Sequence, residues 1–324
     1  MRRRDFLSAL GGAAVLAPCN LHAQQAGRTY RVGVFVSVNN PAMNTAYRAF
    51  IDEMRALGFV EGQNLVLIQR PTDQPSAELA ANVADAVRSR VDAIVTTTQP
   101  ALQAAAGTDL PVIISANNYD PIAHGYVKSL AHPGGNVTGV FMRQTELAEK
   151  QVELLTQAFP ERRRVAILWD SISVDQFTAA ERRAKAMGLD VISMKFGTPP
   201  YDFAAAFYKG VQDGAQQALC LSSPFLGRFA QDIVDQATRH RLPTMFIFRA
   251  YAELGGLMSY GADPAAIFRQ IAGHVAKVLR GAKPADLPVE QPNKFELVVN
   301  LKAAKAIGIE LPTAILLRAD QVIE

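Results

Sequence analysis

The sequence has few cysteines, no strong excess of charge of one sign and no long apolar run in its body. Two cysteines, Cys19 and Cys220, are too few for a disulfide framework or a cysteine-based zinc site. Lys and Arg number 33 against 30 Asp and Glu, and no basic patch stands out, which argues against a partner bound through nucleic-acid phosphates. A 324-residue chain that is 49% hydrophobic is instead typical of a two-domain globular protein.

The common enzyme motifs are also missing. No G-x-G-x-x-G segment follows an expected strand, and the chain has no phosphate loop, no H-E-x-x-H pair and no G-x-S-x-G turn. The five histidines share no spacing typical of metal ligands. We therefore expect a protein that is not an enzyme and that uses no metal and no cofactor.

The N-terminus predicts an export signal. Residues 3–7 read R-R-D-F-L, the twin-arginine pattern, and a short apolar stretch then runs toward the small residue Ala23. This stretch is shorter than the roughly 20 residues that span a bilayer. We expect residues 1–23 to be a signal peptide of the twin-arginine type and the mature protein to be periplasmic. Lipid anchoring through Cys19 is a second interpretation, which Pro18 before the cysteine disfavours.

The rest of the chain alternates short apolar segments with amphipathic helical ones. Strands are expected at 31–36, 65–68, 93–97 and 110–114, and again at 165–169, 190–194, 218–221 and 242–247. The spacing between Gly58 and Gly188, which end helices, nearly equals that between Pro111 and Pro243, which open the fourth strands. This repetition predicts an α/β fold of two Rossmann-like lobes with parallel sheets.

The last third of the chain adds elements that connect the lobes. Strands are expected at 257–260 and 295–300, with a helix at 263–280 before a proline-rich stretch. Proline-rich connections are semi-rigid and suit crossings between lobes. The expected boundaries are 29–141 plus 250–288 for lobe 1, and 142–249 plus 289–324 for lobe 2.

Polar and aromatic side chains gather directly after the expected strands. Ligands of open α/β sheets bind beyond the carboxyl ends of the strands, so these side chains are the candidate ligand-binding residues. They are Ser37, Asn39, Thr97, Thr98, Asn117, Asp120, Trp169, Ser171, Ser173, Ser222, Ser223, Phe225, Phe248 and Arg249. Hydroxyls and helix N-termini suit a small carboxylate, and the aromatic rings supply flat apolar walls.

Each of these residues also has an ordinary structural interpretation. Serine and threonine after a strand often cap the next helix, and aromatic residues at strand ends are often core. Asp120 before Pro121 has the pattern of a helix cap. Arg249 can pair with Glu253, four residues on, as a surface ion pair.

Several segments distributed along the chain carry a family resemblance. They are the N-terminal signal, 58–64 (GFVEGQN), 132–139 (HPGGNVTG), 255–261 (GGLMSYG), 283–288 (KPADLP) and 294–302 (KFELVVNLK). With them the chain resembles the substrate-binding proteins of a bacterial ABC transporter family with the type I periplasmic binding fold. The resemblance implies two lobes joined by three hinge crossings, which close on a ligand.

One branch of that family binds tryptophan and related aromatic amino acids. Hydroxyl residues after strand three and an Asp-Pro after strand four face the cleft in that branch, which the resemblance carries over to Thr97, Thr98 and Asp120. The function it implies is an extracytoplasmic component that captures a small, amino-acid-like ligand for an ABC permease in the inner membrane. Two alternatives stay open, namely an exported hydrolase or transferase using Asp120 or Asp170 as base, and a ligand sensor for a membrane signalling partner.

Overall fold

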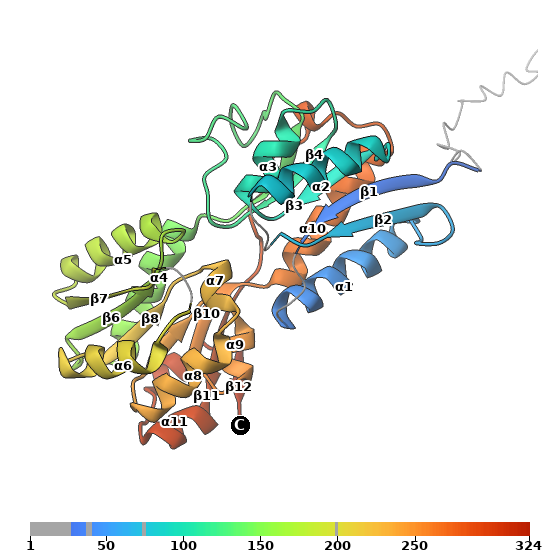
Figure 1. The fold of residues 1–324 in the computed structure, drawn as a ribbon. Coiled ribbons are helices and arrows are strands. Elements are labelled where there is room, and N and C mark those ends of the chain that lie inside the picture. The colour runs from blue at the N-terminus through green and yellow to red at the C-terminus, as the bar shows by residue number, and fades with distance from the viewer. Residues whose placement is uncertain (1–26, 37–40, 73–75, 198–199) are drawn as a thin grey trace, which may run out of the picture.

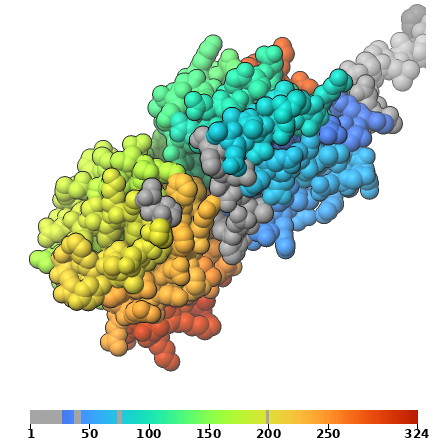
Figure 2. All heavy atoms as spheres, in the orientation of Figure 1, coloured from blue at the N-terminus to red at the C-terminus, as the bar shows by residue number. Residues whose placement is uncertain are grey.

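The computed structural model describes residues 27–36, 41–72, 76–197 and 200–324, which form two lobes (Figure 1). The space-filling view shows the mainly blue and teal first lobe in contact with the mainly green-to-orange second lobe (Figure 2). The expected signal at 1–23 and the candidates Ser37 and Asn39 lie outside the described residues. Within the described ranges, no helix has the length and apolar character needed to cross a membrane.

The first lobe contains a five-stranded parallel sheet in the order β2-β1-β3-β4-β5. The strands are β1 (Tyr30–Phe35), β2 (Leu65–Arg70), β3 (Ala93–Thr96), β4 (Val112–Ala116) and β5 (Val137–Phe141). Successive strand side chains point to opposite faces, so each apolar strand feeds two core clusters. One face packs on α1 (Pro41–Ala56) and α10 (Pro264–Leu279), the other on α2 (Ser76–Arg88) and α3 (Gln99–Ala106).

The second lobe contains a seven-stranded sheet in the order β12-β11-β10-β9-β8-β6-β7. Its pairs are parallel except β10 with β11. Its strands are β6 (Arg164–Trp169), β7 (Asp190–Lys195), β8 (Gln217–Cys220), β9 (Thr244–Phe246), β10 (Met258–Ala262), β11 (Phe295–Asn300) and β12 (Gln321–Ile323). Its helices are α4 (Gln144–Ala158), α5 (Val174–Ala186), α6 (Phe203–Gln212), α7 (Pro224–Gly227), α8 (Ala230–Arg239), α9 (Arg249–Glu253), α11 (Leu301–Ile307) and α12 (Thr313–Leu316).

The two sheets repeat one strand order, which confirms the predicted pair of Rossmann-like lobes. Read in chain order, β1 to β5 and β6 to β10 both form sheets with the first strand between the second and the third. Gly58 and Gly188 follow the first helix of each half with φ of 87° and 74°, the left-handed conformation expected of a helix end. β11 and β12 then extend the second sheet only.

Three segments carry the chain between the lobes, as the resemblance implies. They lie between β5 and α4, between β10 and α10, and between Glu290, which bridges to Val140 of β5, and β11. The domain boundary differs from the expected one, because β10 lies in the second sheet, whereas the sequence predicts 250–288 in lobe 1. The physical reason is that β10 pairs with both β9 and β11, while α10 packs on the first lobe.

A glycine on the fifth strand of each half allows a close backbone approach. A Cβ at Gly139 of β5 would overlap the carbonyl oxygen of Ile114 in β4. A Cβ at Gly261 of β10 would overlap the carbonyl oxygen of Ile247, directly after β9. In both lobes, glycine is therefore required where the fifth strand passes the fourth.

We expect Gly139→Ala and Gly261→Ala each to lower the free energy of unfolding by about 2 kcal/mol or more, because the added methyl group meets backbone that cannot move aside. Denaturant unfolding followed by circular dichroism measures this. Gly135→Ala is the matched control, since a Cβ there meets nothing within 4 Å. Equal stability of the three variants would contradict the close-approach argument.

Candidate functional site

The carboxyl ends of the two parallel sheets face one another. The segment after β4 in the first lobe meets α5 of the second lobe, where Gln176 Nε2 donates a hydrogen bond of 3.2 Å to Asn118 Oδ1. In Figure 1, α7, which follows β8, lies on the side of the second lobe nearest the first. The residues that follow β3 and β4 therefore lie across from those that follow β6 and β8, which is where a ligand of this fold class binds.

A buried carboxylate joins the loops that follow β6 and β8. Asp170 is 1% exposed, and its Oδ1 accepts from the backbone N–H of Ile172 and Ser173 at 3.0 and 3.2 Å and from Ser173 Oγ at 3.2 Å. Ser223 Oγ donates to the other oxygen, Oδ2. A buried carboxylate is stable only when it gains such donors. Ser173 and Ser223 are thus brought together, and both are used to hold Asp170.

Ser223 has a second role as the cap of α7. Its Oγ accepts from the backbone N–H of Phe225 at 3.1 Å and of Leu226 at 3.4 Å. Asp170 is thus held both by its own turn and by Ser223. Asp120 Oδ1 accepts from the N–H groups of Ile122 and Ala123 in its own turn at 2.8 and 3.2 Å. Both carboxylates therefore hold the backbone of the turns around them.

The first lobe presents a hydroxyl with no hydrogen-bond partner within the described ranges. Thr98 is the residue before α3, with an extended backbone, and its side chain makes no capping bond to that helix. Its Oγ1 is buried and has no hydrogen-bond partner among the described residues. Buried polar atoms are nearly always paired in native proteins, so a ligand or a water molecule is the expected partner. Thr97 beside it is half-buried.

Gln144 is a further buried polar residue near this edge, and it is not among the predicted site residues. It begins α4, two residues after Met142, whose N–H donates to the carbonyl of Ala116 at the end of β4. The residue is 6% exposed, and neither amide atom has a partner in the described part of the chain. The sequence does not indicate that Gln144 is buried, because a glutamine at the first position of a helix is usually exposed to solvent.

Trp169 lies on the α5 side of the second sheet rather than beyond the strand end. Its ring stacks on Phe177 of α5 with centroids 4.3 Å apart, and its indole N–H donates to Ser193 Oγ at 2.8 Å. Lys195 Nζ lies 4.8 Å from the ring centroid. The alternation of side chains along β6 explains this position, since Trp169 shares a face with Val165 and Ile167.

The other predicted residues occupy varied environments. Arg249 Nε pairs with Glu253 at 2.7 Å, which is the surface pair considered from the sequence. Asn117 is half-buried and accepts from Ser115 Oγ at 3.2 Å. Phe248 is half-buried against the core, Phe225 is 39% exposed at the start of α7, and Ser171 is exposed. No cluster of three His, Cys, Asp or Glu side chains that could hold a metal occurs among the residues described.

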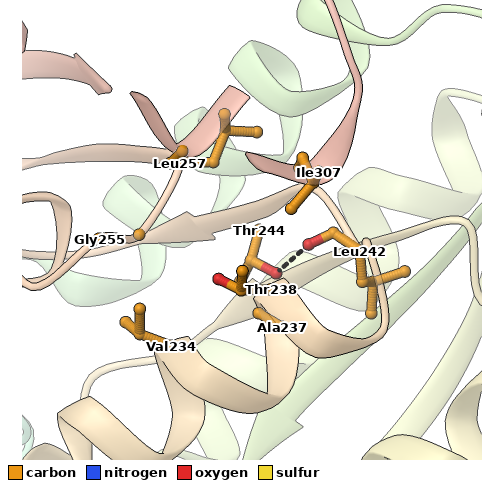
Figure 3. Close-up of a pocket in the computed structure, with 10 residues that line it drawn as sticks. Val234, Ala237, Thr238, Leu242, Thr244, Gly255, Leu257 and Ile307 are labelled. Carbon is orange, nitrogen blue, oxygen red and sulfur yellow. Dashed lines mark hydrogen bonds between the residues drawn. The ribbon is translucent and has the colours of Figure 1, made fainter. Parts of the chain in front are cut away.

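Two cavities lie away from the facing edges. A small one, of about 10 Å³, is bounded by α8, α11 and the ends of β9 and β10 inside the second lobe, where Thr244 Oγ1 donates to the Leu242 carbonyl at 2.9 Å (Figure 3). It holds one water molecule at most. A depression of about 230 Å³ lies at the crossings, lined in part by Phe141, Arg143, Tyr260 and Phe295.

Burial raises the pKa of two groups that also feel the charge of Asp170, namely Cys220 and Tyr201. Burial, with a smaller effect of the Asp170 charge, raises the pKa of the Cys220 thiol to about 12. Burial also raises the pKa of Tyr201, where Asp170 adds to the shift and Arg228 opposes it. Cys220 is therefore a neutral core residue on β8, as its apolar sequence neighbourhood predicts.

The chain matches a known protein family and is similar to a named protein. A family model described as ABC transporter substrate binding protein matches residues 31–323, which span both lobes. A protein named as a tyrosine-binding protein of Clostridioides difficile is 23% identical over 291 residues, covering 86% of this chain and 81% of that protein.

Two solved structures resemble this chain over most of its length. A Streptococcus pneumoniae domain crystallised with L-Trp is 28% identical and superposes with a TM-score of 0.79, covering 91% of this chain and 100% of that one. A conserved domain protein of Vibrio cholerae is 24% identical with a TM-score of 0.81, covering 91% and 99%. The second likeness supports the two-lobed fold alone.

We expect the Cys220 thiol to make stability fall at alkaline pH. Folding raises its pKa from 9.0 to about 12, so the contribution of the neutral thiol is complete below pH 9 and is lost as pH rises toward 12. The free energy of unfolding of the wild type should fall faster above pH 9 than that of Cys220→Ala, by up to about 1.4 kcal/mol per pH unit. Urea unfolding at several pH values measures both slopes. Parallel slopes would contradict the raised pKa.

Proposed function

The chain belongs to the family of ABC transporter substrate-binding proteins, and from that membership we propose that it captures an aromatic amino acid between its two lobes and releases it unchanged. The observation that carries the ligand class is the 28% identity, over the whole of that domain, to a protein crystallised with L-Trp. The relative named for tyrosine binding supports the same class. Closure of two lobes on such a ligand needs only rotation at the crossings.

The ligand carboxylate binds at the first-lobe edge in this proposal. Thr98 Oγ1 has no partner among the residues that the structure describes, and α3 begins there without a side-chain cap, so the hydroxyl and the first N–H groups of the helix can together receive an anion. Asp120 uses Oδ1 in its own turn, which leaves Oδ2 to accept from the ligand ammonium. Phe225, exposed on the opposite lobe, supplies an apolar surface for the ring.

The proposed place of action is outside the cytoplasm, where family members work. Residues 1–23 would direct twin-arginine export, with cleavage after Ala23 releasing the protein into the periplasm. The partner is then an ABC permease in the inner membrane, which receives the ligand from the closed protein. Mass spectrometry of the mature N-terminus separates this from lipid attachment at Cys19.

We expect L-tryptophan, L-tyrosine or L-phenylalanine to raise the melting temperature and to give a saturable calorimetric titration, whereas L-alanine and D-ribose leave the melting temperature unchanged. A ligand that binds only the folded protein stabilises it by mass action. Absence of any shift with the three aromatic amino acids would refute the proposed ligand class.

Thr98→Val tests the position of the ligand. Removing a hydroxyl that bonds a charged ligand group should weaken binding by about 10-fold or more. The ligand-free variant should melt at or above the wild-type temperature, because it no longer buries an unpaired hydroxyl. Thr178→Val is the control, since Thr178 Oγ1 donates to Val174 within α5. Wild-type affinity in Thr98→Val would move the ligand elsewhere.

A further inference from the structure

Gln176 is held in one orientation by the backbone of the loop after β8. The side chain is on α5 and is 4% exposed. Its Oε1 accepts from the Ser222 N–H at 3.1 Å, and its Nε2 donates to the Ser222 carbonyl at 3.0 Å. A backbone N–H can only donate and a carbonyl can only accept, so these two bonds fix which amide atom is which.

The fixed amide has one N–H left, and it points to the other lobe. Nε2 carries two hydrogens, one of which is used by the Ser222 carbonyl. The second is donated to Asn118 Oδ1 at 3.2 Å. Asn118 lies after β4 in the first lobe, so this hydrogen bond joins the lobes at the ligand edge and away from the three crossings.

We propose that the Asn118–Gln176 hydrogen bond is a latch that holds the two lobes closed, with Gln176 as its positioning residue. The inference rests on the proposed function, because a latch matters to a protein that closes on a ligand. Rotation about the crossings separates Asn118 from Gln176, so the bond forms only in the closed form. Gln176 needs no rearrangement to make it, since Ser222 already orients the amide.

The latch also connects the lobes through the site itself. Ser222 precedes Ser223, which donates to Asp170, so Asn118 is linked through Gln176 to the loop network of the second lobe. Neither Asn118 nor Gln176 is placed against the ligand in the proposed function. The latch is therefore expected to change the lifetime of the closed form rather than the ligand contacts.

The test compares Asn118→Leu with Asn118→Asp. Leucine matches asparagine in shape but cannot accept a hydrogen bond, whereas aspartate keeps an acceptor for the Gln176 N–H. With L-tryptophan as the probe, Asn118→Leu should raise the dissociation rate about 3- to 10-fold, as expected for one net hydrogen bond. Asn118→Asp should dissociate at the wild-type rate.

Small-angle X-ray scattering of the ligand-free proteins gives a second readout. We expect Asn118→Leu to have a larger radius of gyration than the wild type and Asn118→Asp, because its lobes are no longer latched. Identical dissociation rates and radii in the three proteins would overturn the latch. If the wild type does not bind L-tryptophan, L-tyrosine or L-phenylalanine, the proposed function fails, and the scattering comparison alone decides the latch.

Gln176→Met completes a double-mutant cycle with Asn118→Leu. The loss from the double variant should be smaller than the sum of the two single losses, because both remove the same bond. Additive effects would overturn the latch, since they would mean that the two side chains act independently. Thermal unfolding of each variant identifies any that fail to fold, and Asn118→Asp still tests the proposal without altering Gln176.

Discussion

Two sheets joined by three short segments can rotate relative to one another but cannot slide apart. The second and third segments are tied together, since the Asp263 N–H donates to the Lys294 carbonyl at 3.3 Å, and the first is tied to β4 by the bond from Met142 to Ala116. Because β1–β5 and β6–β10 each end at the edge of their sheet that faces the other lobe, that rotation opens or closes the gap between these two edges. The polar residues at the two edges approach one another only through this rotation.

The sequence alone predicts the architecture well. Buried parallel strands are continuous apolar runs, and the glycines and prolines that punctuate them repeat in the two halves, so both the sheets and the duplication are visible without coordinates. The boundary at β10 is not visible, because whether that strand joins the first or the second sheet depends on pairing across the whole chain. β12 is three residues long and gives too little periodicity to detect.

The candidate site is less predictable, for identifiable reasons. Residues after strands can be named from the sequence, but whether Ser223 faces a ligand or a buried carboxylate depends on Asp170, which is 53 residues away. The position of the Trp169 side chain depends on the alternation of side chains along β6. The sequence does not fix on which face of the sheet the last residue of a strand lies. Gln176 gives no sequence signal at all, because a glutamine within an amphipathic helix is ordinarily solvated, and both of its partners lie far along the chain.

The two edges differ in how many of their polar groups are already hydrogen-bonded before a ligand binds. In the second lobe, Asp170, Ser173 and Ser223 already satisfy one another, whereas the Thr98 hydroxyl on the first lobe has no partner in the described part of the chain. An arriving molecule that docks on the second lobe therefore loses little entropy to loop ordering there. The second-lobe loops therefore need no local rearrangement when the lobes close, and any ordering that closure requires falls on the first-lobe edge.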